Sequence, residues 1–135
     1  MIGITFEFDA KNNVLRVAVD GQVTDSVLLD FYGLASDYTA SHPPCRGLWD
    51  FSGVTSFDVS SGTMRQLARS SPLTPPGYIS VLVAPGDFLF GMARMFQILG
   101  EKTRPELHVV HTMEEAYRLL GVKNLEFRSI RPPER

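Results

Sequence analysis

Two segments near the N-terminus alternate apolar and polar residues, which is the period-two pattern of β-strands. They are residues 4–9 (ITFEFD) and 14–19 (VLRVAV). The intervening residues 11–13 (KNN) suit a turn, because Asn tolerates a left-handed backbone. Strands this close in sequence are predicted to pair as an antiparallel hairpin.

Helical and strand patterns alternate along the rest of the chain. A helix is predicted to start at Thr24 or Asp25, either of which can cap it, and to end near Tyr38, before two prolines. Residues 78–84 (YISVLVA) are almost continuously apolar, as is typical of a parallel strand covered on both faces. The same reasoning predicts further strands at 46–51, 107–110 and 125–130, and further helices at about 60–69, 88–99 and 112–121.

Strands that alternate with helices imply parallel crossover units. We therefore predict an α/β fold: a single-domain mixed β-sheet with an N-terminal antiparallel hairpin, then parallel strand–helix units, and about four helices. The domain is expected to occupy residues 1–125, and residues 126–135 are expected to form an edge strand or a flexible C-terminal tail. The predicted core contains Phe6, Val17, Phe31, Leu48, Val81, Phe96, Val109 and Leu120.

Length and charge narrow the class of protein. The chain has 135 residues, of which 44% are hydrophobic and 21% charged, as expected for one ordinary globular domain. Its 13 basic residues are matched by 15 acidic ones, so a nucleic-acid partner is not expected. No apolar run is long enough for a membrane span, and the N-terminus lacks the pattern of a signal peptide. We therefore expect a cytoplasmic protein.

Residues able to carry chemistry are scattered along the chain. His108 and His111 stand three apart at the end of a predicted strand with no third ligand nearby, so no metal site is expected. Asp9, Asp50 and Asp58 are explained as well by strand and loop capping as by acid–base work, and no nucleophile is seen beside a base. We expect no cofactor and no enzymatic activity.

Two segments resemble STAS domains, the fold of anti-sigma-factor antagonists. Residues 49–62 (WDFSGVTSFDVSSG) are similar to the central strand, loop and serine-serine-glycine turn of that family, and residues 107–121 (LHVVHTMEEAYRLLG) to its closing strand and helix. The order of elements is closest to the SpoIIAA-like group, often labelled STAS/SEC14-type. The resemblance implies a regulatory or protein-interaction module, and the SEC14-type relationship implies a binder of a hydrophobic molecule.

The start of the predicted helix at 60–69 is the candidate regulatory site. Free backbone amides and a partial positive charge favour an anion there. When the serines are aligned, the resemblance places the phosphorylated serine at Ser60, and Val59 stands where the family antagonists carry Asp. When the acid is aligned instead, at Asp58, Val59 falls at the phosphorylated position. Plain helix capping by Ser60 is the other interpretation. The residues of this candidate site are Ser60, Ser61, Gly62 and Thr63.

The predicted helix at 88–99 is mainly apolar, with Arg94 as its one charged residue. The side chains expected to face the core are Phe88, Met92, Met95, Phe96 and Leu99. The side chains then expected to form an exposed surface for a partner or a second copy of the chain are Phe90, Arg94, Gln97 and Ile98. Coverage of this surface by the 70–77 loop is the alternative.

These observations favour a non-catalytic regulatory or protein-interaction module, controlled by a phosphate or ligand at the helix that opens at Ser60. Its expected partner is a second copy of the chain or another protein. The alternative is a binder of a small hydrophobic ligand or lipid, as in SEC14-like proteins. That alternative requires an interior cavity or groove, which the sequence alone does not reveal.

Overall fold

The computed structural model describes residues 3–133 and contains six strands and four helices within that range. The strands are β1 (Gly3–Asp9), β2 (Val14–Thr24), β3 (Arg46–Asp58), β4 (Ser80–Val83), β5 (Leu107–Val110) and β6 (Arg128–Ile130). The helices are α1 (Asp25–Ser41), α2 (Ser61–Arg69), α3 (Asp87–Leu99) and α4 (Met113–Leu120). The predicted α/β fold with a mixed sheet is confirmed.

All six strands belong to one sheet, in the order β5-β4-β3-β2-β1-β6. β1 pairs antiparallel with β2 and β6, whereas β2 to β5 run parallel. β2 and β3 are longer than predicted, because they stay paired beyond an irregularity at Gly21 as far as Thr24 and Asp58. Gly21 has a φ of 87°, a backbone conformation that glycine adopts without strain.

The C-terminal segment forms the edge strand β6 beside β1. The buried carboxylate of Asp9 holds the start of this segment, since it accepts hydrogen bonds from the backbone N–H of Asn12 at 3.0 Å and of Glu126 at 2.9 Å. The strand lies within the predicted segment 126–135, of which residues 134–135 lie outside the described residues.

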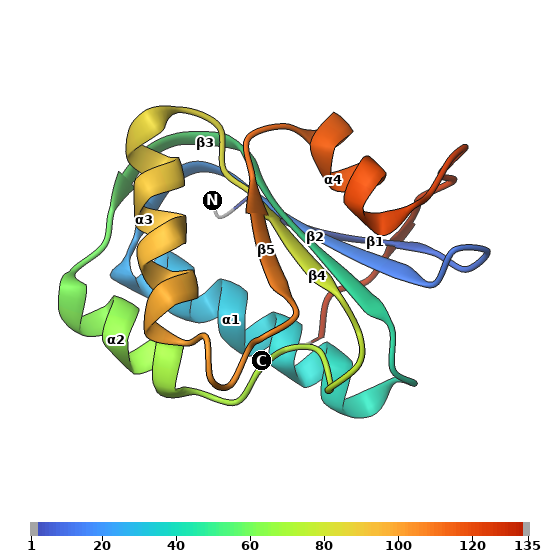
Figure 1. The fold of residues 1–135 in the computed structure, drawn as a ribbon, viewed down its shortest axis with the longest axis horizontal. Coiled ribbons are helices and arrows are strands. Elements are labelled where there is room, and N and C mark those ends of the chain that lie inside the picture. The colour runs from blue at the N-terminus through green and yellow to red at the C-terminus, as the bar shows by residue number, and fades with distance from the viewer. Residues whose placement is uncertain (1–2, 134–135) are drawn as a thin grey trace.

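Helices cover both faces of the sheet (Figure 1): α1, α2 and α3 pack on one face, and α4 packs on the other. Successive side chains of a strand point to opposite faces of the sheet, so each strand contributes residues to the core on both faces. Trp49 of β3 and Leu82 of β4 belong to the three-helix side, whereas Leu48 and Val81, one residue earlier, pack under α4. The other predicted core residues that are buried are Phe6, Val17, Phe31 and Leu120, and those that are half-buried are Phe96 and Val109.

The predicted inward face of α3 is partly wrong. The helix buries Leu89 and Ala93 and half-buries Phe96, a stripe that fits where α3 packs against α2 and β5. α3 carries apolar side chains all round, so its periodicity is compatible with more than one rotation about the helix axis. The predicted core residues that are exposed instead are Phe88 (66%), Met95 (39%) and Leu99 (47%).

Candidate functional site

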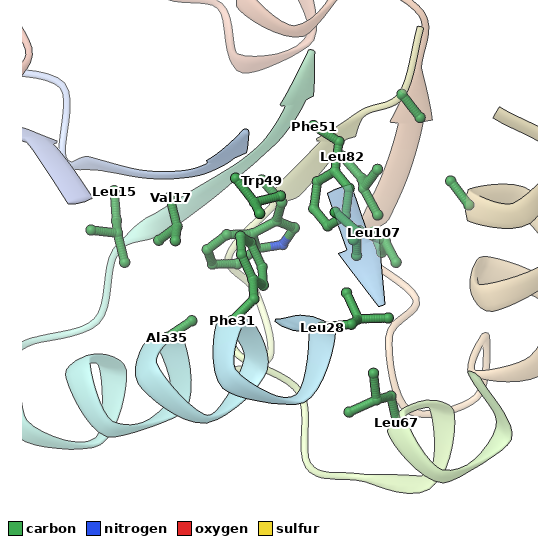
Figure 2. Packing of buried hydrophobic residues seen from close by; sticks show 14 of the residues in the cluster. Leu15, Val17, Leu28, Phe31, Ala35, Trp49, Phe51, Leu67, Leu82 and Leu107 are labelled. Carbon is green, nitrogen blue, oxygen red and sulfur yellow. The ribbon is translucent and has the colours of Figure 1, made fainter. Parts of the chain in front are cut away.

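A cavity of about 330 Å³ lies between the sheet and the helices α1–α3. Its floor includes Trp49 of β3 and Leu82 of β4, and Phe31 of α1 contributes to the opposite wall. Figure 2 shows the indole of Trp49 between the strands and Phe31. The lining is completed by the 72–78 loop, which leads from α2 to β4, and by residues 102–107, which lead into β5.

Small residues make room at the floor of the cavity. Gly47 and Ser80 are paired across β3 and β4, and their neighbours Leu48 and Val81 point to the opposite face of the sheet. Gly47 has no side chain, so the ring of Trp49 folds back over it: a Cβ atom at Gly47 would lie 2.4 Å from Cζ2 of that ring. The aromatic ring thus lies flat along the floor.

The 72–78 loop (PLTPPGY) has limited backbone freedom. Pro72, Pro75 and Pro76 each fix their own φ angle, and Gly77 takes a φ of 89° that other residues rarely adopt. The backbone N–H of Tyr78 closes the turn by donating to the carbonyl of Pro75 at 3.2 Å. The loop is therefore a preshaped wall of the cavity.

Among the buried residues that line the cavity, two have a polar side-chain group without a hydrogen-bond partner within residues 3–133: the indole N–H of Trp49 and the hydroxyl of Ser80. Each residue is only 5% exposed. Every fully enclosed side-chain nitrogen or oxygen in the described part of the chain has a partner. The two free groups must therefore reach open space, and that space is the cavity they line.

Arg104 closes one side of the cavity and is 8% exposed. Its two terminal nitrogens donate hydrogen bonds to the hydroxyls of Tyr32 and Thr103 and to the carbonyls of Leu67, Ala68 and Ser70 at the end of α2. The partial negative charge of a helix C-terminus stabilises such a cation. The guanidinium also lies 4.9 Å from the ring centroid of Phe96. Within residues 3–133 it forms no ion pair.

Ser60 caps α2, as one interpretation of the sequence predicts, and its hydroxyl accepts from the N–H of Thr63 at 3.2 Å. Ser61 and Gly62 are exposed in the first turn. The carboxylate of Asp25 already occupies this helix start: it accepts from the Ser60 N–H at 2.7 Å and from its hydroxyl at 2.9 Å. These bonds lower the pKa of Asp25. A phosphate on Ser60 would therefore lie beside the carboxylate of Asp25, and the two negative charges would repel each other.

The structure separates the four residues predicted as one partner surface on α3. Phe90 is half-buried, and its ring stacks on His111 with a centroid distance of 3.8 Å. Gln97 turns toward the sheet and donates to the carbonyl of Leu107 at 2.8 Å. Arg94 and Ile98 are exposed. The expectation of an exposed Phe90 is therefore wrong, because His111 covers its ring.

The face of the sheet under α4 carries an ionic cluster. Arg16 pairs with Glu7 and with Asp50, whose carboxylate is 2.6 Å from the guanidinium and 2% exposed. Burial by itself raises the pKa of Asp50, but hydrogen bonds from Ser52 and Arg16 outweigh burial and hold the pKa below its usual value. These groups satisfy one another, which points to a structural role.

No family model matches the chain, and no curated protein matches it significantly. Within residues 3–133, no three residues among His, Cys, Asp and Glu gather in a way that could hold a metal ion. None of the described helices combines the length and the apolar character needed to span a membrane.

Sequence reasoning did not single out the cavity residues Trp49, Ser80 and Arg104. Weak signals existed: Ser80 is the one polar residue within an apolar strand, and Gly47 stands two residues before a large aromatic. Neither signal reveals a cavity, because the cavity depends on which segments far apart in the chain meet above the strands.

Proposed function

We propose that this protein binds a small, mainly apolar molecule in the cavity between the sheet and α1–α3. The observation that carries the proposal is the cavity itself, whose volume of about 330 Å³ lies in the usual range of ligand pockets. Aliphatic and aromatic side chains make up most of its floor and walls, and a few polar groups line it as well. Ligand pockets commonly combine these two features.

Imperfect packing is a poor explanation for a space of this size. The space is not an interior void: its lining includes exposed residues such as Pro75 and Lys102, so it opens to solvent as ligand clefts do. The volume of this cavity corresponds to the share of about eleven water molecules in the liquid. A wall preshaped by three prolines and a floor opened by Gly47 and Ser80 both favour a space that is built to be filled.

A cavity-filling variant tests the proposal. Ala93 lines the cavity from α3, and its neighbour Arg94 is exposed, so Ala93→Phe and Arg94→Phe add the same ring inside and outside. We expect naphthalene to bind the wild type and Arg94→Phe in isothermal titration, and Ala93→Phe to lose binding while it stays folded by circular dichroism. Absence of binding to the folded wild type, or equal binding to Ala93→Phe, would contradict the proposal.

A second candidate function is the regulatory or protein-interaction role implied by the STAS resemblance, which stays a prediction. The observation that favours it is the exposed apolar face of α3, formed by Phe88, Met95, Ile98 and Leu99. A helix face of this kind can pack antiparallel on its own copy across a twofold axis, so the partner proposed is a second copy of the chain.

Phosphorylation of Ser60 is the form of control that this second candidate would use. Asp25 starts α1 and Ser60 caps α2, so their hydrogen bonds tie the two helices together at one end. A phosphate would replace the hydroxyl hydrogen by negative charge and repel Asp25. Modification would therefore loosen this junction.

A further inference from the structure

We infer that the ligand carries a neutral carbonyl oxygen, which accepts hydrogen bonds from the indole N–H of Trp49 and the hydroxyl of Ser80. This inference rests on the proposed function, because it names the chemical class of molecule that the cavity takes.

Trp49 and Ser80 are unusual because both are buried and neither has a partner in residues 3–133. A largely buried polar group without a protein partner is unfavourable unless a water or a ligand atom bonds to it. The two groups therefore mark a place where a polar atom of a ligand, or a water in its absence, stabilises the protein. Apolar packing alone would be better served by phenylalanine and alanine at these positions.

The strand register brings the two donors together. Ser80 is the partner of Gly47 across β3 and β4, and the ring of Trp49 lies over Gly47 along the edge that bears Cε2 and Cζ2. The indole nitrogen is bonded to Cε2, so it lies next to the ring atoms that cover Gly47, the cross-strand partner of Ser80. Figure 2 shows this nitrogen on the side of the ring turned toward Leu82 and Leu107.

A carbonyl oxygen matches this pair of donors. It has two lone pairs, so one oxygen can accept from both groups at once. The indole N–H can only donate, whereas the serine hydroxyl can rotate to donate or accept. Ketones, esters and amides share this acceptor, and the inference concerns the carbonyl that they have in common.

The charges around the cavity favour a neutral carbonyl over a carboxylate. Burial of a carboxylate is costly unless a cation pairs with it. Arg104 is the buried cation beside the cavity, and both of its terminal nitrogens are engaged with hydroxyls and with the α2 carbonyls. Lys102 is exposed, and the acidic Glu106 lines the same side.

The volume of the cavity sets the size of the part of the molecule that lies inside it. Space equal to the share of about eleven water molecules holds a body of roughly ten to thirteen non-hydrogen atoms. The aromatic residues on the floor and walls favour a flat ring system, because offset or edge-to-face ring contacts add to burial of the same area. An aromatic ketone of two fused rings has both the size and the acceptor.

Three probes of matched shape test the inference: naphthalene, methyl naphthyl ketone and naphthoate. Trp49 is the only tryptophan in the chain, so the nitrogen–proton correlation NMR spectrum contains a single indole signal. We expect the ketone to bind about tenfold more tightly than naphthalene, from two added hydrogen bonds. We also expect the ketone alone to move the indole proton downfield, and naphthoate to bind more weakly than the ketone.

Variants identify the donors. Ser80→Ala and Trp49→Phe should each lower the affinity for the ketone about 3- to 10-fold and leave the affinity for naphthalene nearly unchanged. Ser129→Ala, on the exposed edge strand β6, is the matched control and should change neither. Because naphthalene needs no hydrogen bond, it reports separately on whether the variants retain the cavity.

The outcomes separate this inference from the proposed function. Equal affinity for naphthalene and the ketone, or an unmoved indole signal, would overturn the carbonyl while leaving the cavity as a binding site. Tighter binding of naphthoate than of the ketone would overturn the neutral head group. Binding of none of the three probes would contradict the proposed function itself.

Discussion

The indole ring of Trp49 lies directly over Gly47, two residues earlier on β3, and a Cβ atom at Gly47 would come within 2.4 Å of the ring. Real Cβ atoms do not approach this closely, so a side chain at Gly47 and the present position of Trp49 exclude each other. This relationship explains how a large aromatic can lie flat on a strand and leave open space above it.

Gly47→Ala is therefore expected to displace Trp49 into the cavity. Overpacking of this kind costs about 1–3 kcal/mol, measurable as a lower free energy of unfolding in urea. The fluorescence of the single tryptophan should shift at the same time. Gly91→Ala on α3 is the control: nothing lies within 4 Å of its added Cβ, and alanine favours a helix. Similar stability of both variants would show that the ring moves without cost.

Arg104 and Tyr32 should act as one unit, because the arginine donates to the tyrosine hydroxyl at 2.8 Å and that hydroxyl donates to the carbonyl of Ser71. Arg104→Lys loses the planar set of donors and is expected to cost about 2–3 kcal/mol of unfolding free energy. Arg118→Lys, on an exposed pair of α4, should change stability by less than about 0.5 kcal/mol.

A double-mutant cycle measures the coupling. Tyr32→Phe removes the hydroxyl and is expected to cost about 1 kcal/mol alone, and less in the Arg104→Lys background. Additive costs would mean that the two side chains stabilise the α2 end independently.

Asp50 predicts a pH dependence of stability. Its pKa is lowered in the folded protein, so its ionised form adds stability above the pKa of the unfolded chain, near 4, and this stability disappears as the pH falls through the folded pKa. Asp50→Asn should cost about 1–3 kcal/mol at neutral pH, because Arg16 loses one partner.

The variant should also lose less stability than the wild type when urea unfolding is repeated below pH 4. The control is Glu114→Gln, which removes the charge of the residue paired with Arg118 on the exposed face of α4. Parallel pH profiles for the wild type and Asp50→Asn would mean that Asp50 has an ordinary pKa.

Ser60→Asp separates helix capping from the contact with Asp25. On the helix alone, aspartate is a good N-cap and is favoured by the helix dipole. Beside the carboxylate of Asp25 the charge is unfavourable, so Ser60→Asp should unfold at a lower temperature than Ser60→Asn at neutral pH. The difference should shrink in the Asp25→Asn background. Equal melting of the two Ser60 variants would show that Asp25 does not oppose an anion there.

The sequence predicted where helices and strands lie better than it predicted which side of a helix is buried or how far two strands stay paired. Short-range signals such as strand alternation, the Thr112 cap and the glycine stop at Gly121 correctly located β5 and α4. α3 was located but wrongly rotated, because a helix that is apolar all round needs its neighbours to decide which side is buried. The extension of β2 and β3 depends on their pairing with each other, which no local pattern contains.

The same limit applies to the candidate sites. Ser60 was correctly predicted to cap a helix, because a cap is local. Asp25, which occupies that helix start, comes from 35 residues earlier. The cavity depends on still more distant segments: its floor pairs Gly47 with Ser80, and Arg104 bonds to the end of α2.

The rotation of α3 changes the test for self-association. Phe88 is 66% exposed and lies on the same face as Met95 and Ile98, whereas Phe90 is covered by His111. If two copies pair through antiparallel α3 helices, Phe88 of each copy packs near Ile98 of the other, and its burial contributes about 1.5–3 kcal/mol before association costs. Phe88→Glu should therefore convert a dimer into a monomer without lowering the thermal midpoint of the monomer.

The same substitution two residues later is its matched control. Phe90→Glu breaks the stack on His111 and should lower the thermal midpoint, while the apolar face formed by Phe88, Met95 and Ile98 keeps its side chains. Sedimentation velocity at micromolar concentration distinguishes the cases. A monomeric wild type would exclude self-association through α3, and a dimer that survives Phe88→Glu would move the interface to another surface.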